Sequence, residues 1–362
     1  MSLAAGAAVG PPPGMRVRLS SNESPFGPSP AAVAAASQAL AEAHRYPDDA
    51  SAALRAAIAA EEGLHPEQVA VGNGSAALLM DLIPERCAGQ ADAEVVAFER
   101  SFVVYRLAAR NAGARYLEVA TGGPAVGDRP GYQRDVEALL AAVTDRTRVV
   151  VVDNPANPTA AHVTGAALRH LADGLPDHVT LIVDEAYHHF ATGQDGYARV
   201  GALGLEHPHL AVLTTFSKAY ALAGLRVGAL LGPAELVAAT DGRRPRFNLT
   251  APAQAAAIAS LADTDHLAVT VEGTVAGRER LSAGLAALGV PHSAGLANFV
   301  TVELGTDAGP VVAAFAEQGI GVRALQPYGL HEQVRITVGT PEEVEAVLTA
   351  AASVLAEVPS RE

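Results

Sequence analysis

The chain has 362 residues, of which 49% are hydrophobic, so it is long enough for one large domain and a smaller one. Its net charge of -14 argues against nucleic-acid or anionic-membrane partners, which need basic patches. A single cysteine, Cys87, excludes an intramolecular disulfide and a cysteine metal site, and we expect no metal. No apolar run approaches the ~20 residues of a membrane span, which predicts a cytoplasmic location.

In the first two thirds of the chain, short apolar runs rich in β-branched residues alternate with segments rich in alanine and leucine. Strands are predicted at residues 68–71, 94–98, 114–119, 147–152, 179–183, 210–214 and 227–231. Helices are predicted between them, including residues 76–83, 102–111, 136–142 and 165–174. This alternation indicates an α/β fold with a mostly parallel sheet covered on both faces, which binds ligands at the carboxyl ends of its strands.

The chain changes character near residue 250. Residues 252–288 predict one or two long helices, and short strands at 299–303, 322–324 and 334–338 are followed by a helix at 341–354. We therefore predict three parts. These are an N-terminal arm (residues 1–30), a large domain (31–250) and a small α+β domain (251–362).

The first candidate site motif is the turn Gly72-Asn73-Gly74-Ser75, which follows a predicted strand and opens a predicted helix. Free backbone N–H groups at a helix start bind phosphate, so Gly74, Ser75 and Ala76 are candidate phosphate ligands. The turn also matches a degenerate dinucleotide fingerprint, with Glu99 as the possible ribose ligand. A nicotinamide-dependent dehydrogenase is therefore an alternative at this point.

Two further segments after predicted strands carry candidate groups. Tyr105 or Phe102 could stack on a planar ring, although core packing is the more frequent role of a single aromatic residue. Asn157 lies in a loop, residues 153–159, in which two prolines prevent helix and strand. Its amide could donate to a phenolate oxygen of a ligand, and the alternative is an ordinary Asn-Pro turn.

Asp184 comes directly after the predicted strand at 179–183, so it should point into the ligand crevice. A pyridoxal cofactor needs a carboxylate against its ring nitrogen, because the protonated pyridinium is its electron sink. Tyr187, three residues further on, could reach the ring hydroxyl. The alternative for Asp184 is a solvated acid that caps a helix.

Lys218 is the only lysine in the chain, and it stands two residues after Phe216 and eight before Arg226. A lysine that loses its proton can form a Schiff base with an aldehyde. Thr215, Ser217 and Arg226 are donors of the kind that a phosphate needs. Together these residues predict pyridoxal 5'-phosphate as the cofactor.

Arg335 lies within the predicted strand at 334–338. An unpaired guanidinium is costly to bury, so Arg335 needs an anionic partner. A carboxylate or phosphate of the substrate would provide one, and an internal ion pair is the alternative.

The order of these motifs, together with Asn22-Glu23-Ser24-Pro25-Phe26-Gly27-Pro28 and Tyr46-Pro47-Asp48, resembles that of fold-type I aminotransferases of the class I/II superfamily. The chain is most similar to the histidinol-phosphate aminotransferase family, from about residue 19 to residue 354. The resemblance implies a pyridoxal-phosphate enzyme that moves an amino group between an amino acid or amino-phosphate and a 2-oxo acid by a ping-pong mechanism.

The resemblance also implies a role for each cofactor-site residue. Lys218 would form the Schiff base and move the proton, and Asp184 would pair with the pyridine nitrogen. Asn157 and Tyr187 would bond the ring hydroxyl, and Tyr105 would stack on the ring. The groups expected to hold the phosphate are Gly74, the backbone N–H groups of Ser75 and Ala76, Thr215, Ser217 and Arg226.

Other residues would serve the substrate or a second subunit. Arg335 would bind the anionic end of the substrate with help from Arg323, and Asn22 and Glu23 would lie over the substrate on the N-terminal arm. Tyr46 would reach the cofactor phosphate in a neighbouring subunit. The resemblance therefore implies a homodimer with shared active sites.

Three departures from the family pattern leave the substrate open. Ala160 replaces the usual glycine of the Asn-Pro loop, Ala76 and Ala77 replace two acidic residues, and His188-His189 follow Tyr187. Histidinol phosphate, an aromatic amino acid and an amine of specialised metabolism all remain candidates. The alternative function is elimination, cyclisation, decarboxylation or oxidation with the same cofactor, and an inert sensor domain is less favoured.

Overall fold

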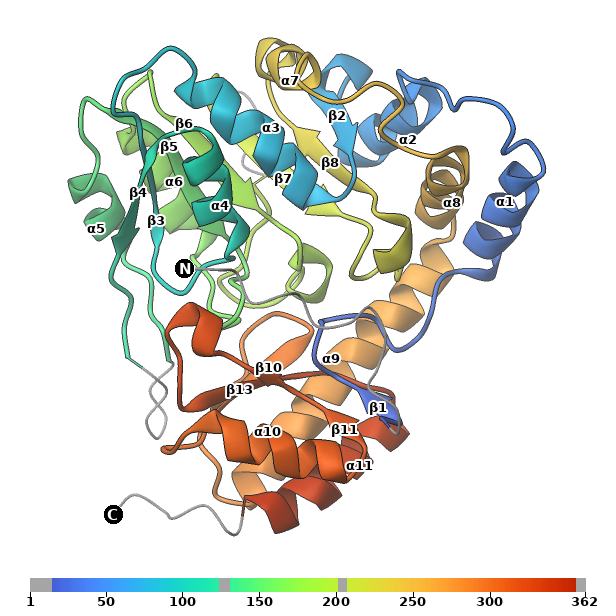
Figure 1. Cartoon of the computed structure of the whole chain (residues 1–362), viewed down its shortest axis with the longest axis vertical. Helices are drawn as coiled ribbons and strands as arrows, with labels where there is room; N and C mark the ends of the chain where they lie inside the picture. The colour runs from blue at the N-terminus through green and yellow to red at the C-terminus, as the bar shows by residue number, and fades with distance from the viewer. Residues whose placement is uncertain (1–14, 124–130, 201–206, 356–362) are drawn as a thin grey trace.

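The computed structural model describes residues 15–123, 131–200 and 207–355. These residues form a larger upper part and a smaller lower part, which the long helix α9 (Thr264–Ala287) connects (Figure 1). The first 14 residues of the predicted N-terminal arm lie outside the described residues.

The larger part is built on a seven-stranded sheet with the order β2-β8-β7-β6-β5-β3-β4. Neighbours from β7 to β4 are parallel, and β8 runs antiparallel to both β2 and β7. The strands are β2 (Val69–Gly72), β3 (Glu94–Phe98), β4 (Arg115–Val119), β5 (Thr147–Asp153), β6 (Thr180–Asp184), β7 (Leu210–Thr215) and β8 (Gly228–Leu231). The predicted α/β fold with a mostly parallel sheet is confirmed.

Both faces of this sheet are buried because alternate residues of each strand enter different cores. Val96 and Phe98 of β3 pack in one cluster, whereas Val95 and Ala97 pack in the other. The helices of the larger part are α1 (Pro30–Leu40), α2 (Ala52–Glu62), α3 (Ser75–Cys87), α4 (Val104–Asn111), α5 (Val136–Ala141), α6 (Gly165–Gly174), α7 (Ala234–Asp241) and α8 (Ala251–Ala262). Helices lie on both faces of the sheet, whereas α1 packs against α8 at the edge of the molecule (Figure 1). Continuous apolar strands are the expected consequence of this two-sided burial.

The smaller part contains a four-stranded antiparallel sheet with the order β12-β13-β10-β9 and a two-stranded parallel sheet, β1-β11. Its elements are β1 (Val17–Arg18), β9 (His292–Ser293), β10 (Phe299–Glu303), α10 (Ala308–Glu317), β11 (Ile320–Gly321), β12 (Arg323–Ala324), β13 (Gln333–Thr337) and α11 (Pro341–Val354). Strand β1 pairs with β11, so the N-terminal segment joins the smaller part. The predicted α+β character of this part is confirmed.

The predicted helical stretch at 252–288 is two helices that separate at Asp263. The Asp263 side chain accepts a hydrogen bond from the N–H of His266 and so caps the start of α9. Helix α8 packs against α1 and α2 of the larger part, and α9 continues into the smaller part. The domain boundaries predicted from the sequence stay a prediction.

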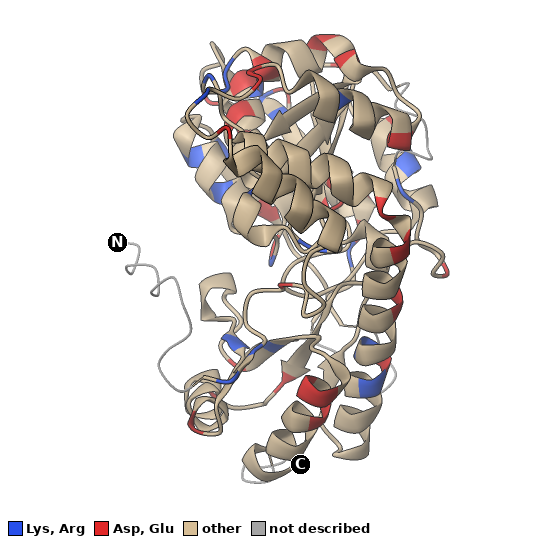
Figure 2. Cartoon of the chain, turned by 90° about the vertical axis from the view of Figure 1, so that its right-hand side faces the viewer, with Lys and Arg blue, Asp and Glu red and all other residues tan. Residues whose placement is uncertain are grey.

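Acidic and basic residues are interspersed over the side of the molecule drawn in Figure 2. None of the helices in the described ranges combines the length and the apolar character that a membrane span requires.

Candidate functional site

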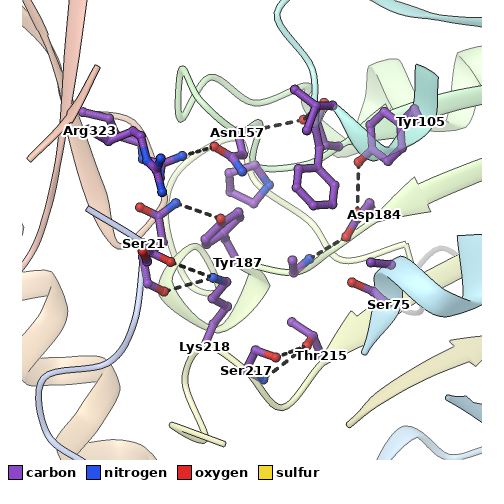
Figure 3. Close-up of a pocket in the computed structure, with 18 of the residues that line it drawn as sticks. Ser21, Ser75, Tyr105, Asn157, Asp184, Tyr187, Thr215, Ser217, Lys218 and Arg323 are labelled. Carbon is purple, nitrogen blue, oxygen red and sulfur yellow. Dashed lines mark hydrogen bonds between the residues drawn. The ribbon is translucent and has the colours of Figure 1, made fainter. Parts of the chain in front are cut away.

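A cavity of about 400 Å³ lies where the carboxyl edge of the seven-stranded sheet meets the smaller part (Figure 3). The larger part contributes strand ends and loops, and the smaller part contributes residues near β12 and β13. Most of the residues predicted from the sequence line it, namely Asn22, Ser75, Ala76, Phe102, Tyr105, Asn157, Asp184, Tyr187, Thr215, Ser217, Lys218, Arg226, Arg323 and Arg335. Side chains from distant parts of the sequence therefore converge on one space.

The parallel strands explain why polar groups gather at this edge. Asp153 is the last residue of β5, Asp184 the last of β6 and Thr215 the last of β7. Asp153 and Asp184 are register partners on neighbouring strands. All three side chains line the cavity, as expected for the carboxyl ends of parallel strands.

Asp184 is a buried carboxylate that accepts hydrogen bonds from the hydroxyl of Tyr105 (3.0 Å) and the backbone N–H of Ala186 (3.2 Å). Burial raises the pKa of Asp184 to about 7, and the nearby charge of Asp153 adds to the rise. The two hydrogen bonds oppose the rise only in part. Asp184 is therefore suited to pair with a cationic group in the cavity, which would restore its charge.

Lys218 reaches into the same cavity from the loop after β7 (Figure 3). Its ammonium nitrogen donates to the backbone oxygen of Asn22 (3.0 Å) and lies 5.6 Å from the ring centroid of Tyr187. Burial lowers the pKa of Lys218 to about 8, and the positive charge of Arg335 lowers it further. A lysine with such a pKa supplies a neutral, nucleophilic amine near physiological pH.

Arg335 points from β13 into the cavity and is 5% exposed. Its guanidinium donates to the amide oxygen of Asn157 and to the backbone oxygen of Ser20 (3.0 Å), and its Nε has no hydrogen-bond partner. Burial lowers the pKa of Arg335, and within the described residues it forms no ion pair with an acidic side chain. No acidic side chain among the described residues therefore meets the predicted need for an anionic partner.

Donors gather at the start of α3 in an arrangement that suits an anion. The Arg226 Nη1 donates to Ser217 Oγ (3.2 Å), which lies 3.0 Å from Thr215 Oγ1. Gly74 precedes α3 with a positive φ of 80°, and a Cβ added there would lie 2.5 Å from the Arg226 guanidinium. A side chain at Gly74 would have to displace the Arg226 guanidinium and adopt a φ that favours glycine, so the sequence turn and the Arg226 loop form one cradle.

Three predicted residues lie outside the lining of this cavity. Gly74 precedes α3 and faces the Arg226 guanidinium, as described above. Glu23 lines a neighbouring hollow and lies 3.7 Å from Arg18. Its negative charge still acts on Lys218, because it partly opposes the lowering of the Lys218 pKa. Tyr46 is 82% exposed and stacks on Phe247 with ring centroids 4.6 Å apart.

The two histidines after Tyr187 are structural neighbours of the site and do not line it. His188 and His189 lie in a 3₁₀ turn, with ring centroids 3.7 Å apart, and His188 is 4% exposed. Burial lowers the pKa of both imidazoles. This placement agrees with a structural role for the two histidines and not with a contact to the substrate.

The alanine that replaces a glycine in the Asn-Pro loop keeps a glycine-like backbone. Ala160 has a φ of 58°, in the left-handed region that alanine rarely adopts. Its side chain is fully buried with Tyr187 and Phe299, which packs the loop against the smaller part.

Sequence reasoning missed three residues at the site. Asp153 ends β5 in the same way that Asp184 ends β6, and this shared position was a usable signal. Arg134 forms a buried ion pair with Asp153 at 2.7 Å, and Tyr328 lines the cavity from the smaller part. Neither Arg134 nor Tyr328 belongs to a motif, because only tertiary packing brings Arg134 against Asp153 and Tyr328 to the cavity.

Glu99, the ribose ligand that the nicotinamide-dependent dehydrogenase would need, does not line this cavity. Glu99 accepts hydrogen bonds from the N–H and hydroxyl of Thr121 and forms an ion pair with Arg100. It lines a separate hollow rather than the cavity that holds Lys218.

The chain resembles known aminotransferases over most of its length. The model of the family described as aminotransferase class I and II matches residues 15–350. An aromatic amino acid aminotransferase of Rhodococcus opacus is 42% identical, over 93% of this chain and 90% of that protein. A histidinol-phosphate aminotransferase of Ruegeria pomeroyi is 41% identical, over 92% of this chain and 90% of that protein.

Solved structures agree with this comparison. The crystal structure of histidinol-phosphate aminotransferase from Sinorhizobium meliloti in complex with pyridoxal-5'-phosphate has a TM-score of 0.85 and 29% identity, covering 95% of this chain and 92% of that one. A Thermus thermophilus aspartate aminotransferase double mutant has a TM-score of 0.80 and 26% identity, covering 93% and 91%. This chain therefore belongs to the aminotransferase class I and II family.

Proposed function

We propose that this aminotransferase uses pyridoxal 5'-phosphate to transfer an amino group from a donor with a flat ring and an anionic end to a 2-oxo acid. The donor is an aromatic amino acid or histidinol phosphate, the substrates named for the relatives from R. opacus and R. pomeroyi. The observation that carries this proposal is the convergence of the only lysine, the buried Asp184 and the buried Arg335 on one cavity.

The residues of the cavity fit the cofactor. The cradle of Thr215, Ser217 and Arg226 at the start of α3 supplies donors for a phosphate, and the absence of a Cβ at Gly74 leaves room for it. Asp184, whose pKa is raised to about 7, gains from a protonated ring nitrogen beside it. Tyr105, Tyr187 and Asn157 line the space between these two ends, where the ring would lie.

When bound, pyridoxal phosphate supplies an aldehyde that accepts the amino group of one substrate and an electron sink for the carbanion at its Cα. Lys218 would hold the cofactor and, once the amino group of the substrate has replaced it, would be free as a neutral amine to take the proton from Cα and return it to the cofactor side. Asp184 would keep a proton on the ring nitrogen. Asn157 and Tyr187 would bond the ring hydroxyl, and Tyr105 would stack on the ring.

The substrate would be held by its anionic end. Arg335 supplies the buried guanidinium, and Arg323 lies at the mouth of the cavity, where its Nε donates to the backbone oxygen of Ser20 (3.1 Å). Phe102 and Tyr328 supply flat surfaces for an aromatic or imidazole ring. Asn22 and Glu23 would cover the substrate from the N-terminal arm.

The test uses one amino donor at a time, without any 2-oxo acid. A transaminase then releases one oxo acid for each active site and stops, whereas an elimination, decarboxylation or oxidation enzyme continues to turn over. We expect the burst with phenylalanine, tyrosine or histidinol phosphate and its loss in Lys218→Ala, which should keep its circular dichroism spectrum. Continued turnover without an acceptor, or a wild-type burst in Lys218→Ala, would overturn the proposal.

The exposed aromatic pair formed by Tyr46 and Phe247 supports a homodimer in which Tyr46 reaches the phosphate bound by the partner subunit. We expect Tyr46→Ala to bind the cofactor weakly and Lys218→Ala to be inactive. Mixing the two unfolded variants and refolding them together should restore activity, because one site of each mixed dimer has both groups. If activity is not restored although sedimentation shows dimers, the active sites are not shared.

A cytoplasmic location also stays a prediction, which imaging of a tagged chain would test.

A further inference from the structure

The carboxylate of Asp153 joins two segments of the cavity wall to the segment before α5. Its Oδ1 accepts hydrogen bonds from Ser101 Oγ (3.0 Å) and Arg134 Nη1 (2.7 Å). Its Oδ2 accepts from the backbone N–H groups of Phe102 (3.2 Å) and Asn157 (3.1 Å). Four donors satisfy a carboxylate, so Asp153 ties the turn after β3, the loop after β5 and the segment before α5 to one point.

Arg134 fixes the orientation of this carboxylate. Its side chain is 1% exposed, and its guanidinium carbon lies 5.0 Å from the ring centroid of Phe98. Besides the ion pair, Arg134 donates to the backbone oxygen of Asp153 (2.8 Å) and to Ser101 Oγ (3.1 Å). A buried ion pair with this many bonds allows little change of geometry, because breaking it leaves a buried charge without a partner.

The pair is connected to the proposed substrate site by one residue. Asp153 binds the backbone N–H of Asn157, and the side-chain oxygen of Asn157 accepts a hydrogen bond from Arg335. Both Asn157 and Arg335 are buried. A shift of the Asn157 loop would therefore move the guanidinium that faces the ligand.

We propose that Asp153, held by Arg134, is a positioning residue of the aminotransferase site: it places Asn157 so that Asn157 orients Arg335 toward the anionic end of the substrate. The inference rests on the proposed role of Arg335. Asp153 has no acceptor capacity left for a substrate, so it acts through Asn157. Loss of the Asp153 carboxylate should therefore weaken substrate binding, in addition to any effect on folding.

The test measures the binding of succinate, a dicarboxylate without an amino group, to the cofactor-loaded protein by calorimetry. In Asp153→Asn, the side chain keeps its shape, but its NH₂ group must face either Arg134 or the two backbone N–H groups. We expect the Kd for succinate to rise about tenfold, the usual effect of losing a charge-assisted hydrogen bond. The dissociation constant reports site geometry without any turnover.

Glu94→Gln is the matched control. Glu94 is fully buried and accepts bonds from Thr144 (2.6 Å), Arg146 (3.0 Å) and Arg115 (3.1 Å), but it stands at the opposite end of β3 from the cavity. This variant should also lower the Tm, because a buried carboxylate loses its charge, although its partners Arg115 and Arg146 are more than half exposed. Its Kd for succinate should stay within about twofold of the wild-type value.

Arg335→Gln separates the two hypotheses. If Arg335→Gln binds succinate like the wild type, the proposed anion site is wrong. If it loses binding while Asp153→Asn keeps wild-type affinity, or if Glu94→Gln is weakened equally, only the positioning role is overturned. Should Asp153→Asn not fold, Arg134→Lys replaces it, because it keeps the charge but loses the forked donors. We expect a rise in Kd of about threefold for that variant, and an unchanged Kd would overturn the proposal.

Discussion

The lowered pKa of Lys218 leads to a quantitative prediction for the cofactor-free protein. A pKa of about 8 leaves about one side chain in ten neutral at pH 7, whereas the ordinary value of 10.5 leaves about one in three thousand. The neutral amine is the nucleophile, so Lys218 should present roughly 300-fold more reactive amine to an acylating reagent at pH 7 than the ordinary pKa would allow.

The chain suits this experiment because Lys218 is its only lysine. After labelling at a series of pH values, mass spectrometry separates the Lys218 peptide from the labelled N-terminal peptide. We expect the rate at Lys218 to rise about tenfold per pH unit below a midpoint near 8 and to level off above it. A midpoint at 10.5 or above would refute the argument from burial and neighbouring charge.

Two variants assign the cause of this shift. Arg335→Gln removes a positive charge that lowers the pKa of Lys218, so the midpoint should move to higher pH. Arg280→Gln changes an exposed arginine that is paired with Glu345, and its midpoint should match the wild type. Equal midpoints in all three proteins would contradict the contribution of Arg335 and leave burial and the charge of Arg226 as the causes of the lowered pKa.

Two further predictions concern the cradle and the buried acid. Gly74→Ala should weaken cofactor binding in equilibrium dialysis, because the added Cβ would meet Arg226 and the φ of Gly74 is positive. Gly224→Ala is the control and should bind the cofactor normally, because a Cβ at Gly224 would meet open space. Equal affinities of the two variants for the cofactor would contradict the cradle. In the cofactor-free protein the pKa of Asp184 is raised to about 7, so the folded state binds the proton more tightly and the stability from this group falls as pH rises from ~4 to ~7. Asp184→Asn should remove that fall in urea titrations, and an unchanged pH dependence would count against the raised pKa.

The strands of the large sheet were predictable because each is a continuous apolar run bounded by polar turns. Residues 94–98 were predicted as a strand and form β3 with the same limits. The predicted strands that became β5 and β6 end one residue later in the structure, at Asp153 and Asp184. Burial on both faces removes the alternation that marks other strands, so length and β-branched content were the usable signals.

Helices without a clear apolar stripe were harder to predict. No prediction covered α1 (Pro30–Leu40) or α2 (Ala52–Glu62), whose alanine-rich sequences carry few large apolar residues. Helix α1 is stabilised by packing against α8, a contact between segments about 200 residues apart in the chain. Such a contact leaves no local pattern in either segment.

The sequence by itself determined the local chemistry of this protein: a lone lysine among hydroxyl residues, an aspartate after a buried strand, and a glycine turn before a helix. Each is local because backbone conformation and side-chain type act over a few residues. Only the tertiary structure decided that Arg335 has no acidic partner within the described residues, that Glu23 stands outside the cavity lining, and that Arg134 holds Asp153. Those facts depend on how the smaller part packs on the sheet and on which buried charges meet, and both arise from long-range packing.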